Sequence, residues 1–384
     1  MHTGGQLQAV SGCARTMTTN NVRARTYLKL LFGTGAVLIL FRVFSGHVVP
    51  RPTDITAGLD RLRPAPAPSI IPEPVTTVDT LPCAKLAGAN ETLVIIKTGA
   101  TEIKDKLPVH FDTTLRCYPH SIIFSDYEEE YSGYQVVDAL ANVDKTLQDS
   151  HPDFELWRRL KEGGRAVLAD DELSGPGVKL SGGLGKPENP GWKLDKWKFL
   201  PMLNETLVRY PEMKWYLFVE TDTYIFWTTT LAWLATLDHT KPHYMGAQMQ
   251  IGEVVFAHGG SAFVISQSSM RAAVELYRAN QKEWEDFTNG HWAGDCVLGK
   301  ALADSGTSLT WAWPIFQGVK PGGIDYSRLD YSKRIWCYPT ISYHHMSPDE
   351  VADTWLFEED MTAKVRISLS WHTLTKLTVF RAIN

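Results

Sequence analysis

The sequence of 384 residues lacks the features of a nucleic-acid-binding protein. Its 38 Lys and Arg against 43 Asp and Glu give a net charge of −5, and no long basic run occurs. Because binding to nucleic acid usually needs a basic surface, we expect no nucleic-acid partner. The chain has only five cysteines, whose spacing does not match a structural zinc site. No internal repeat is visible. With 44% hydrophobic and 21% charged residues, the chain has a globular composition and can form one large α/β domain or two ordinary ones.

Acidic residues are absent before Asp54. An apolar run covers residues 30–41, and four basic residues precede it: Arg15, Arg23, Arg25 and Lys29. Basic residues on one flank indicate that this flank is cytoplasmic. The run is shorter than the roughly 20 residues of a full span, but basic side chains at its ends can reach the membrane surface. We predict a cytoplasmic tail at 1–26 and a transmembrane signal-anchor at 27–46. A cleaved signal peptide is the alternative, since its apolar region is equally short.

Residues 47–90 are rich in Pro and Ala and have little periodic pattern. This composition is typical of an extended, semi-rigid stem. We therefore place the lumenal domain at 91–384. Two N-glycosylation sequons, which begin at Asn90 and Asn204, are compatible with the lumenal side of a membrane.

Four of the five cysteines fall on the predicted lumenal side: Cys83, Cys117, Cys296 and Cys337. An oxidising compartment permits two disulfides, and four cysteines allow three pairings. We expect the pairing between neighbours in sequence, Cys83 with Cys117 and Cys296 with Cys337, while the other two pairings remain open.

Short, continuous apolar runs predict the buried strands of a sheet. They lie at 93–96, 122–124 and 215–219. Helical patterns separate or flank them, at 104–116, 136–147, 154–162 and 195–210. In the last of these, Pro201 is compatible with a helix only near the first turn. Strands that alternate with helices predict an α/β fold with a doubly wound parallel sheet.

Two carboxylates, Glu220 and Asp222, directly follow the third apolar run. In open α/β sheets ligands bind beyond the carboxyl ends of the strands. Paired carboxylates there can hold a hard cation and, through it, a diphosphate. A solvated acidic turn has the same short sequence, so this motif is weak by itself. Three further motifs follow in order along the chain: Gly259-Gly260, Gly294-Asp295 and Ser342-Tyr343-His344.

In their order and spacing these motifs resemble glycosyltransferase family 31. The segments WYLFVETDTY, HGGSAFVIS, GDCVLGKAL and WCYPTISYHHMS carry the resemblance, which extends over residues 92–350. It is strongest toward the core 1 β1,3-galactosyltransferase branch, with the fringe enzymes as cousins. The resemblance implies a GT-A-like fold, in which a Rossmann-like half binds the nucleotide sugar and a second half binds the acceptor.

The resemblance assigns Asp222 and His344 as ligands of a divalent metal such as Mn²⁺, and Asp295 as the catalytic base. From the residues alone, Asp295 is equally a helix N-cap, and His344 an ordinary, partly buried histidine. Two positions depart from the family pattern. Thr221 and Gly294 each stand where the family has an acid, which puts metal affinity, donor choice and activity in question.

The resemblance also predicts contacts with the UDP part of the donor. The expected residues are Thr98, Gly99, Asp126, Lys196, Glu220, Thr221, Gly259 and Gly260. Lys198 competes with Lys196 for the position of the family's lysine. Aromatic residues after Trp284 suit either a wall that stacks on an acceptor sugar or ordinary core packing.

The resemblance thus implies an inverting, metal-dependent transfer of a hexose from a UDP-sugar to a glycan hydroxyl. For the nearest branch this is β1,3-galactosylation of N-acetylgalactosamine on glycoproteins. The expected location is a Golgi or early secretory membrane, with a single-pass type II topology and the catalytic domain in the lumen. The alternative is a non-catalytic relative that acts as a lumenal chaperone or scaffold, which Thr221 and Gly294 favour. A secreted lectin would require cleavage of the anchor.

Overall fold

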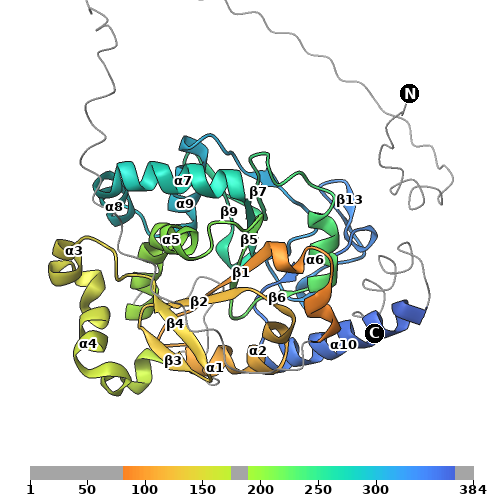
Figure 1. Ribbon diagram of the computed structural model, residues 1–384, viewed down its shortest axis with the longest axis horizontal. Coiled ribbons are helices and arrows are strands. Elements are labelled where there is room, and N and C mark those ends of the chain that lie inside the picture. Colours follow the sequence, from red (N-terminus) through yellow and green to blue (C-terminus); the bar gives the residue numbers. More distant parts are fainter. Residues whose placement is uncertain (1–80, 174–188, 368–384) are drawn as a thin grey trace, which may run out of the picture. The chain divides into compact units, whose positions relative to one another are not determined.

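The computed structural model describes residues 81–173 and 189–367 (Figure 1). The predicted tail at 1–26, the anchor at 27–46 and most of the stem at 47–90 lie outside these residues. Within the described ranges, no helix has the length and apolar character needed to cross a membrane.

The centre of the fold is a mixed, mostly parallel sheet of eight strands in the order β11-β7-β10-β5-β1-β2-β4-β3. Parallel pairs join β1 to β2 and β5, β2 to β4, and β7 to β11. Strand β10 is antiparallel to β5 and β7, and β3 is antiparallel to β4. The strands are β1 Thr92–Lys97, β2 Ser121–Ser125, β3 Glu129–Tyr131, β4 Tyr134–Asp138, β5 Trp215–Glu220, β7 Tyr244–Gly246, β10 Phe263–Ser266 and β11 Thr310–Trp311. This arrangement is Rossmann-like, as the alternation of strands and helices predicts.

Three two-stranded ladders accompany the main sheet. They are β6 Tyr224–Ile225 with β14 Ser342–Tyr343, β8 Gln248–Ile251 with β9 Val254–Ala257, and β12 Leu329–Asp330 with β13 Lys333–Arg334. The α-helices are α1 Ile103–Lys106, α2 Pro108–Asp112, α3 Lys145–Ser150, α4 Glu155–Gly163, α5 Pro190–Arg209, α6 Trp227–Leu234, α7 Gln267–Ala279, α8 Gln281–Asn289, α9 Gly294–Asp304 and α10 Pro348–Ile367.

Helices cover both faces of the sheet, which explains why its central strands are apolar without alternation. In β1, Leu93 and Ile95 pack into one core with α5, α7 and α9. Val94 and Ile96 face the opposite core, which includes residues of α6 and α10. Figure 1 shows α7 and α9 on one side of the sheet and α2 and α10 on the other.

Strand β1 lies between β2 and β5, both parallel to it. The carboxyl ends of these three strands therefore meet at one edge, where Lys97 is in register with Phe124 and with Glu220. From β1 the chain proceeds to β2 and β4 on one side and then crosses back to β5 on the other side of β1. This edge is therefore a topological switch point, the usual ligand-binding position in such sheets.

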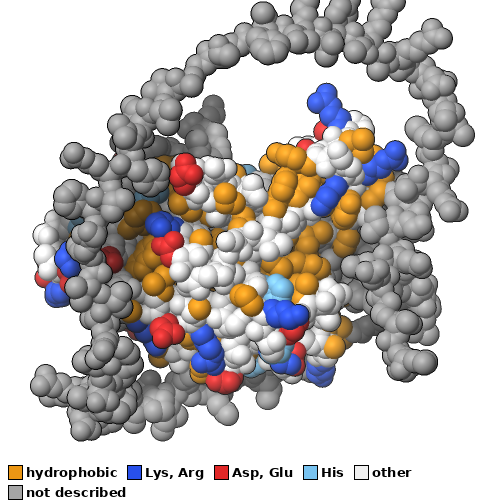
Figure 2. Space-filling view, turned by 90° about the horizontal axis from the view of Figure 1, so that it is seen from above, with side chains coloured by type: hydrophobic (Ala, Val, Ile, Leu, Met, Phe, Trp, Pro, Cys, Tyr) orange, Lys and Arg blue, Asp and Glu red, His pale blue; other side chains and the backbone are white. Residues whose placement is uncertain are grey.

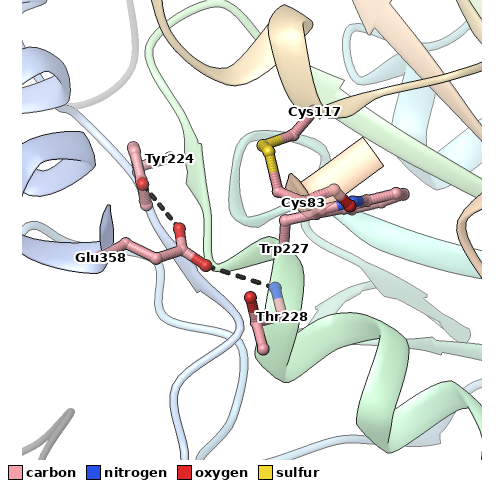
Figure 3. Close-up of a disulfide and its surroundings, with 6 residues drawn as sticks. All are labelled: Cys83, Cys117, Tyr224, Trp227, Thr228 and Glu358. Carbon is pink, nitrogen blue, oxygen red and sulfur yellow. Dashed lines mark hydrogen bonds between the residues drawn. A yellow bond between two sulfur atoms is a disulfide. The ribbon is translucent and has the colours of Figure 1, made fainter. Parts of the chain in front are cut away.

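A disulfide ties the start of the folded body to the segment that follows α2. Cys83 and Cys117 are joined, with their Cα atoms 5.1 Å apart. Figure 3 shows the indole of Trp227 beside this bond, and Trp227 Nε1 donates to the carbonyl of Cys83 at 3.2 Å. The predicted Cys83–Cys117 pairing is confirmed. The predicted Cys296–Cys337 pairing is wrong, because Cys296 is a free, buried thiol in α9.

The folded body begins earlier than the predicted boundary at residue 91. Short 3-10 helices cover Pro82–Lys85 and Ala89–Glu91, and Cys83 and Ala89 are buried in the core. Of the two sequon asparagines, Asn90 is exposed on this segment and Asn204 is half-buried within α5.

Several predicted helices differ from the observed elements. Residues 104–116 break at Pro108 into α1 and α2, because proline begins a helix more readily than it continues one. The helix predicted at 136–147 is wrong, since its first residues belong to β4 and α3 begins only at Lys145. The helices at 154–162 and 195–210 are confirmed as α4 and α5. However, α5 starts at Pro190, so Pro201 lies in the middle of the helix and not near its first turn.

Candidate functional site

The residues that follow β1, β2 and β5 lie together at the switch point. Thr98 and Gly99 follow β1, Asp126 follows β2, and Asp222 lies two residues beyond β5. The turn after β5 is held by a hydrogen bond from Thr223 N to Glu220 O at 3.0 Å. The parallel register therefore gathers the predicted nucleotide and metal residues at one edge of the sheet.

Behind this edge, Asp126 and Lys198 form a fully buried ion pair. Lys198 Nζ lies 3.2 Å from Asp126 Oδ2 and donates to the carbonyl of Thr98 at 2.8 Å. Asp126 Oδ1 accepts from Ala100 N at 2.7 Å. A Cβ on Gly99 would lie 3.2 Å from Asp126 Oδ2, so a glycine suits this crowded turn. The pair fixes the backbone at the end of β1.

The structure favours Lys198 over Lys196 as the lysine at the site. Lys196 Nζ lies 3.0 Å from Asp153 Oδ2 and bonds to the carbonyl of Asn289, away from the strand ends. Lys198, two residues further along α5, points to Thr98 and Asp126. Of the two lysines that compete for this position in the sequence, Lys198 lies among the gathered residues and Lys196 does not.

A second buried cation, Lys97, ends β1. Its Nζ lies 2.6 Å from Asp195 Oδ1 and 3.0 Å from Glu220 Oε1, and 4.7 Å from the ring centre of Phe199. Burial opposes the charged form, but the two carboxylates outweigh burial and raise the pKa of Lys97. Glu220 is therefore held by a lysine and lies beside a small, largely apolar pocket that Lys97, Phe199 and Gly259 also line.

Asp222 meets two consecutive histidines from the opposite end of the chain. Ladder pairing of Tyr343 with Tyr224 brings the C-terminal motif to the turn after β5, and Met346 N donates to Asp222 O at 2.9 Å. His344 Nε2 lies 3.3 Å from Asp222 Oδ1. His345 offers a third ligand atom within 4.8 Å of the other two, and its φ of 61° is left-handed. Such strained backbone is typical of functional sites.

The donor set fits a divalent ion. Asp222 Oδ1 and His344 Nδ1 are buried without a hydrogen-bond partner in the part of the chain that the structure describes. Two ligands at ~2.1 Å from an octahedral ion lie about 3 Å apart, close to the observed 3.3 Å. One carboxylate with one or two imidazoles suits Mn²⁺.

Burial and charge also shape the titration of Asp222. Burial favours its neutral form, but His344 and Lys106 reverse this effect and hold the pKa well below its usual range. Asp222 is therefore ionised, as a metal ligand must be.

Gly259 and Gly260 lie between the candidate metal ligand His344 and the carboxylates Glu220 and Asp295. A Cβ on Gly260 would lie 2.2 Å from His344 Cε1, and one on Gly259 would lie 3.3 Å from Glu220 Oε1 and 3.5 Å from Asp295 Oδ2. Close approach of backbone to these side chains requires glycine at Gly260. The turn therefore has His344 on one side and Glu220 with Asp295 on the other.

Asp295 lies in the first turn of α9, and its carboxylate accepts two backbone hydrogen bonds. Oδ2 accepts from Gly259 N at 2.9 Å, and Oδ1 accepts from Cys296 N at 2.9 Å. Burial raises the pKa of Asp295 to about 6, against the opposing effects of the Gly259 N–H and Lys97. A carboxylate tuned toward neutral pH suits a general base.

The two departures from the family pattern have packing reasons. A Cβ on Gly294 would lie 2.7 Å from Lys196 Cα, so α9 approaches α5 only with glycine there. Thr221 is 2% exposed, and its carbonyl accepts from His110 Nε2 at 2.8 Å. Its hydroxyl has no hydrogen-bond partner within the described residues. Neither position faces the gathered carboxylates.

Sequence reasoning missed four polar residues of the site: Lys97, Lys106, Asp195 and His258. Lys106 Nζ lies 3.1 Å from Asp222 Oδ2, and Asp195 binds Lys97. The His258 ring lies 5.3 Å from that of His344. Burial lowers the pKa of His258 to about 4, and the charge of the nearby His344 adds to this effect. A charged residue that ends an apolar strand was the available signal for Lys97. The others became neighbours only through folding.

Aromatic side chains form two groups at or near the surface. Trp192 and Trp292 stack, with ring centres 6.4 Å apart, and Trp292 is 55% exposed. Trp311, Trp313 and Tyr331 form a second group, with Trp311 and Tyr331 exposed. Figure 2 shows a face on which hydrophobic side chains gather in patches.

A scan against protein-family models gives no match, and a search of curated proteins gives no significant match.

Proposed function

We propose that this protein is an inverting, metal-dependent glycosyltransferase that uses a UDP-sugar as donor. The observation that carries this proposal is the Asp222–His344 pair, linked through Gly259 and Gly260 to Asp295. A cation site for a diphosphate and a separate, tuned carboxylate are what such a reaction needs. The motif resemblance to glycosyltransferase family 31, and a GT-A-like form of the sheet, belong to the same proposal.

The nucleotide would bind at the ends of β1 and β2. Thr98, Gly99 and Asp126 meet there, at the switch point where α/β sheets bind nucleotides. Glu220 lies between this position and Asp295, where donor sugar hydroxyls would need a hydrogen-bond acceptor.

The chemistry follows from the positions of these side chains. Asp222 and His344 would hold a divalent ion, which would supply positive charge near the departing diphosphate. The acceptor hydroxyl gives its proton to the Asp295 carboxylate while its oxygen bonds to the anomeric carbon. The bond from that carbon to the UDP oxygen breaks in the same step. Attack from the face opposite the leaving group inverts the configuration, and one base suffices.

The finer assignment rests on the resemblance alone. It favours galactose as the transferred sugar, N-acetylgalactosamine on a glycoprotein as the acceptor, and a β1,3 linkage. It also favours a type II membrane protein of the Golgi or early secretory pathway. The Cys83–Cys117 disulfide supports an oxidising compartment.

The direct test is transfer by the full-length protein in detergent. It would be mixed with several UDP-sugars and Mn²⁺, with and without glycan acceptors, and UDP release would be measured. We expect release with one donor and loss of release with EDTA. If no UDP-sugar binds and none is consumed, the enzyme proposal is wrong.

Substitution of Asp295 tests the proposed base. Asp295→Asn should bind UDP-sugar normally and lose turnover by about 10²–10⁴-fold. In the unchanged protein, turnover should rise with pH to a plateau above pH 6, because the base acts when ionised and its pKa is about 6. The matched control is Asp286→Asn, at an exposed carboxylate of α8 that pairs with Lys282. Full turnover by Asp295→Asn would remove this residue from the base role.

The second candidate is a non-catalytic lumenal chaperone or scaffold. Thr221 and Gly294, which replace family acids, are the observations that favour it. Their packing weakens this support, since Thr221 is buried and a Cβ at Gly294 would collide with Phe199 and Lys196. Binding of a client glycosyltransferase without any UDP-sugar binding would favour this second candidate.

A further inference from the structure

Lys106 places a positive charge on the proposed metal ligand. It is the last residue of α1, and its Nζ lies 3.1 Å from Asp222 Oδ2 and 2.8 Å from Glu102 Oε2. The side chain of Lys106 is 24% exposed, and that of Asp222 is 16% exposed. This ion pair therefore borders solvent, where a long, flexible lysine side chain can exchange partners.

The two oxygens of Asp222 face different groups. Oδ2 contacts the ammonium of Lys106, whereas Oδ1 lies 3.3 Å from His344 Nε2 without a hydrogen bond. A divalent ion bound through Oδ1 and His344 would lie close to the ammonium, and the two positive charges would repel each other. Lys106 thus lowers the affinity of Asp222 for an ion.

A diphosphate reverses this effect. Its oxygens carry negative charge next to the ion, and a lysine ammonium is a strong phosphate donor with three N–H groups. An ammonium that moves from Asp222 to a phosphate oxygen removes the repulsion and gains a new partner. Glu102, in the turn before α1, remains available as a second contact for the lysine.

We propose that Lys106 is an exchangeable cation that couples divalent-ion binding to diphosphate binding. Lys106 competes with the ion for Asp222 when the nucleotide is absent, and binds a phosphate oxygen when both ligands are present. The role rests on the proposed UDP-sugar site. It makes Lys106 a positioning residue whose effect appears as cooperativity between two ligands.

The experiment measures Mn²⁺ binding to the full-length protein by electron paramagnetic resonance, with and without saturating UDP. For the unchanged protein we expect UDP to raise Mn²⁺ affinity by about tenfold or more, within the usual range of coupling between sites. Lys106→Met removes the charge and keeps much of the stem. It should bind Mn²⁺ alone about tenfold more tightly than the unchanged protein does, and UDP should raise its affinity by less than about threefold.

Two further variants separate charge from folding. Lys106→Arg keeps the positive charge and should keep most of the coupling. Lys104→Met, at an exposed lysine of the same short helix, should match the unchanged protein in both measurements. Melting curves of each variant identify any that fail to fold, and in that case the Lys106→Arg result decides.

The outcomes distinguish this inference from the function on which it rests. In one outcome, Mn²⁺ and UDP bind together while UDP still raises the Mn²⁺ affinity of Lys106→Met as much as that of the unchanged protein. In that case the proposed exchange of Lys106 between Asp222 and phosphate is wrong, and the glycosyltransferase proposal stands. If the unchanged protein binds neither ligand, both proposals fail. Loss of coupling in Lys106→Arg equal to that in Lys106→Met would also contradict a role for the charge.

Discussion

Two aspartates, which follow the strands β2 and β5 on either side of β1, each hold a lysine, yet in different surroundings. Asp126 and Lys198 have side chains that are 0% and 2% exposed. Asp222 and Lys106 are 16% and 24% exposed, and Asp222 also faces two histidines. The first pair is enclosed between the sheet and α5, whereas the second lies where solvent and ligands reach it.

The difference in exposure indicates that the Asp126–Lys198 pair is structural and is compatible with the ligand exchange proposed for the Asp222–Lys106 pair. A buried pair contributes through geometry, because removal of one partner leaves an unpaired charge inside the protein. A partly exposed pair contributes less to stability than a buried one, and its lysine can exchange partners. The same edge of the sheet thus combines a buried ion pair behind the proposed nucleotide site with the proposed exchangeable cation, Lys106.

A third acid, Glu358 on α10, extends the comparison because no cation faces it within the described residues. Figure 3 shows its carboxyl group between Tyr224 and Thr228, which donate hydrogen bonds of 2.7 and 3.3 Å. Burial raises the pKa of Glu358 to about 7, and the neighbouring charge of Glu359 adds to this. Without a lysine, a buried acid takes up a proton instead.

The largest expected effect is on the enclosed pair. Lys198→Met should lower the free energy of unfolding by about 3–5 kcal/mol, because the buried Asp126 carboxyl group would lose its ion-pair partner. Denaturant unfolding followed by circular dichroism measures this change. The double variant Lys198→Met with Asp126→Asn should recover part of the loss. A loss below about 1 kcal/mol would show that the pair is not structural.

Glu358 should give a pH-dependent effect on stability. Between pH 4.5 and 7 the folded protein binds more protons at Glu358 than the unfolded chain, so stability falls as pH rises through this window. The full effect is of the order of 3 kcal/mol above pH 7. Glu358→Gln should remove this dependence and melt at a higher temperature than the unchanged protein at pH 8.

An exposed acid on the same helix is the control for Glu358. Asp353→Asn should retain the pH dependence of the unchanged protein. Parallel melting curves for Glu358→Gln and the unchanged protein from pH 5 to 8 would contradict the assignment.

Gly260→Ala should weaken metal binding at Asp222 and His344, whereas the same change at Gly99, beside the Asp126–Lys198 pair, should not. The added Cβ would lie 2.2 Å from the ring of His344 and displace it from Asp222. Loss of a group that orients a metal ligand typically lowers metal affinity by about 10–100-fold, so displacement of His344 itself should cost at least as much, which Mn²⁺ titration measures. In Gly99→Ala the Cβ would meet Asp126 Oδ2 at 3.2 Å, away from His344, and Mn²⁺ affinity should remain normal. Equal losses in both variants would contradict the separation of the two positions.

The smallest expected effect is that of Lys106 on stability. Lys106→Met should change the free energy of unfolding by no more than about 1 kcal/mol, because its pair borders solvent. Denaturant unfolding alongside Lys198→Met provides the direct comparison. A loss similar to that of Lys198→Met would make both lysines structural.

The sequence predicted the central strands well because they are buried on both faces. β1, β2 and β5 are continuous apolar runs, and this pattern depends little on distant contacts. β4 was predicted as a helix, because its two valines lead into further apolar residues that also fit helical spacing. The antiparallel position of β10 next to β5 comes from the long-range pairing of Phe263 with Phe218, which the sequence alone does not specify.

In the site, the motifs located residues whose positions follow from strand ends and turns. Asp222, Asp126 and the two glycines are of this kind. The choice between Lys196 and Lys198 depends on which side of α5 is buried, and a buried lysine contradicts the usual hydrophobic pattern. The contact of Lys106 with Asp222 joins residues 116 positions apart, so only the folded chain reveals it.

The disulfide has a consequence for where this molecule can be made. Cys83 and Cys117 enclose a loop that contains Thr98, Gly99 and Lys106, and their separation of 34 residues corresponds to about 4 kcal/mol of lost unfolded-chain entropy. In a reducing cytosol the disulfide would not form, and the segment that carries these candidate ligand residues would lack this stabilisation. Export before folding, and the timing of thiol oxidation, would then decide how much of the chain reaches a ligand-competent form.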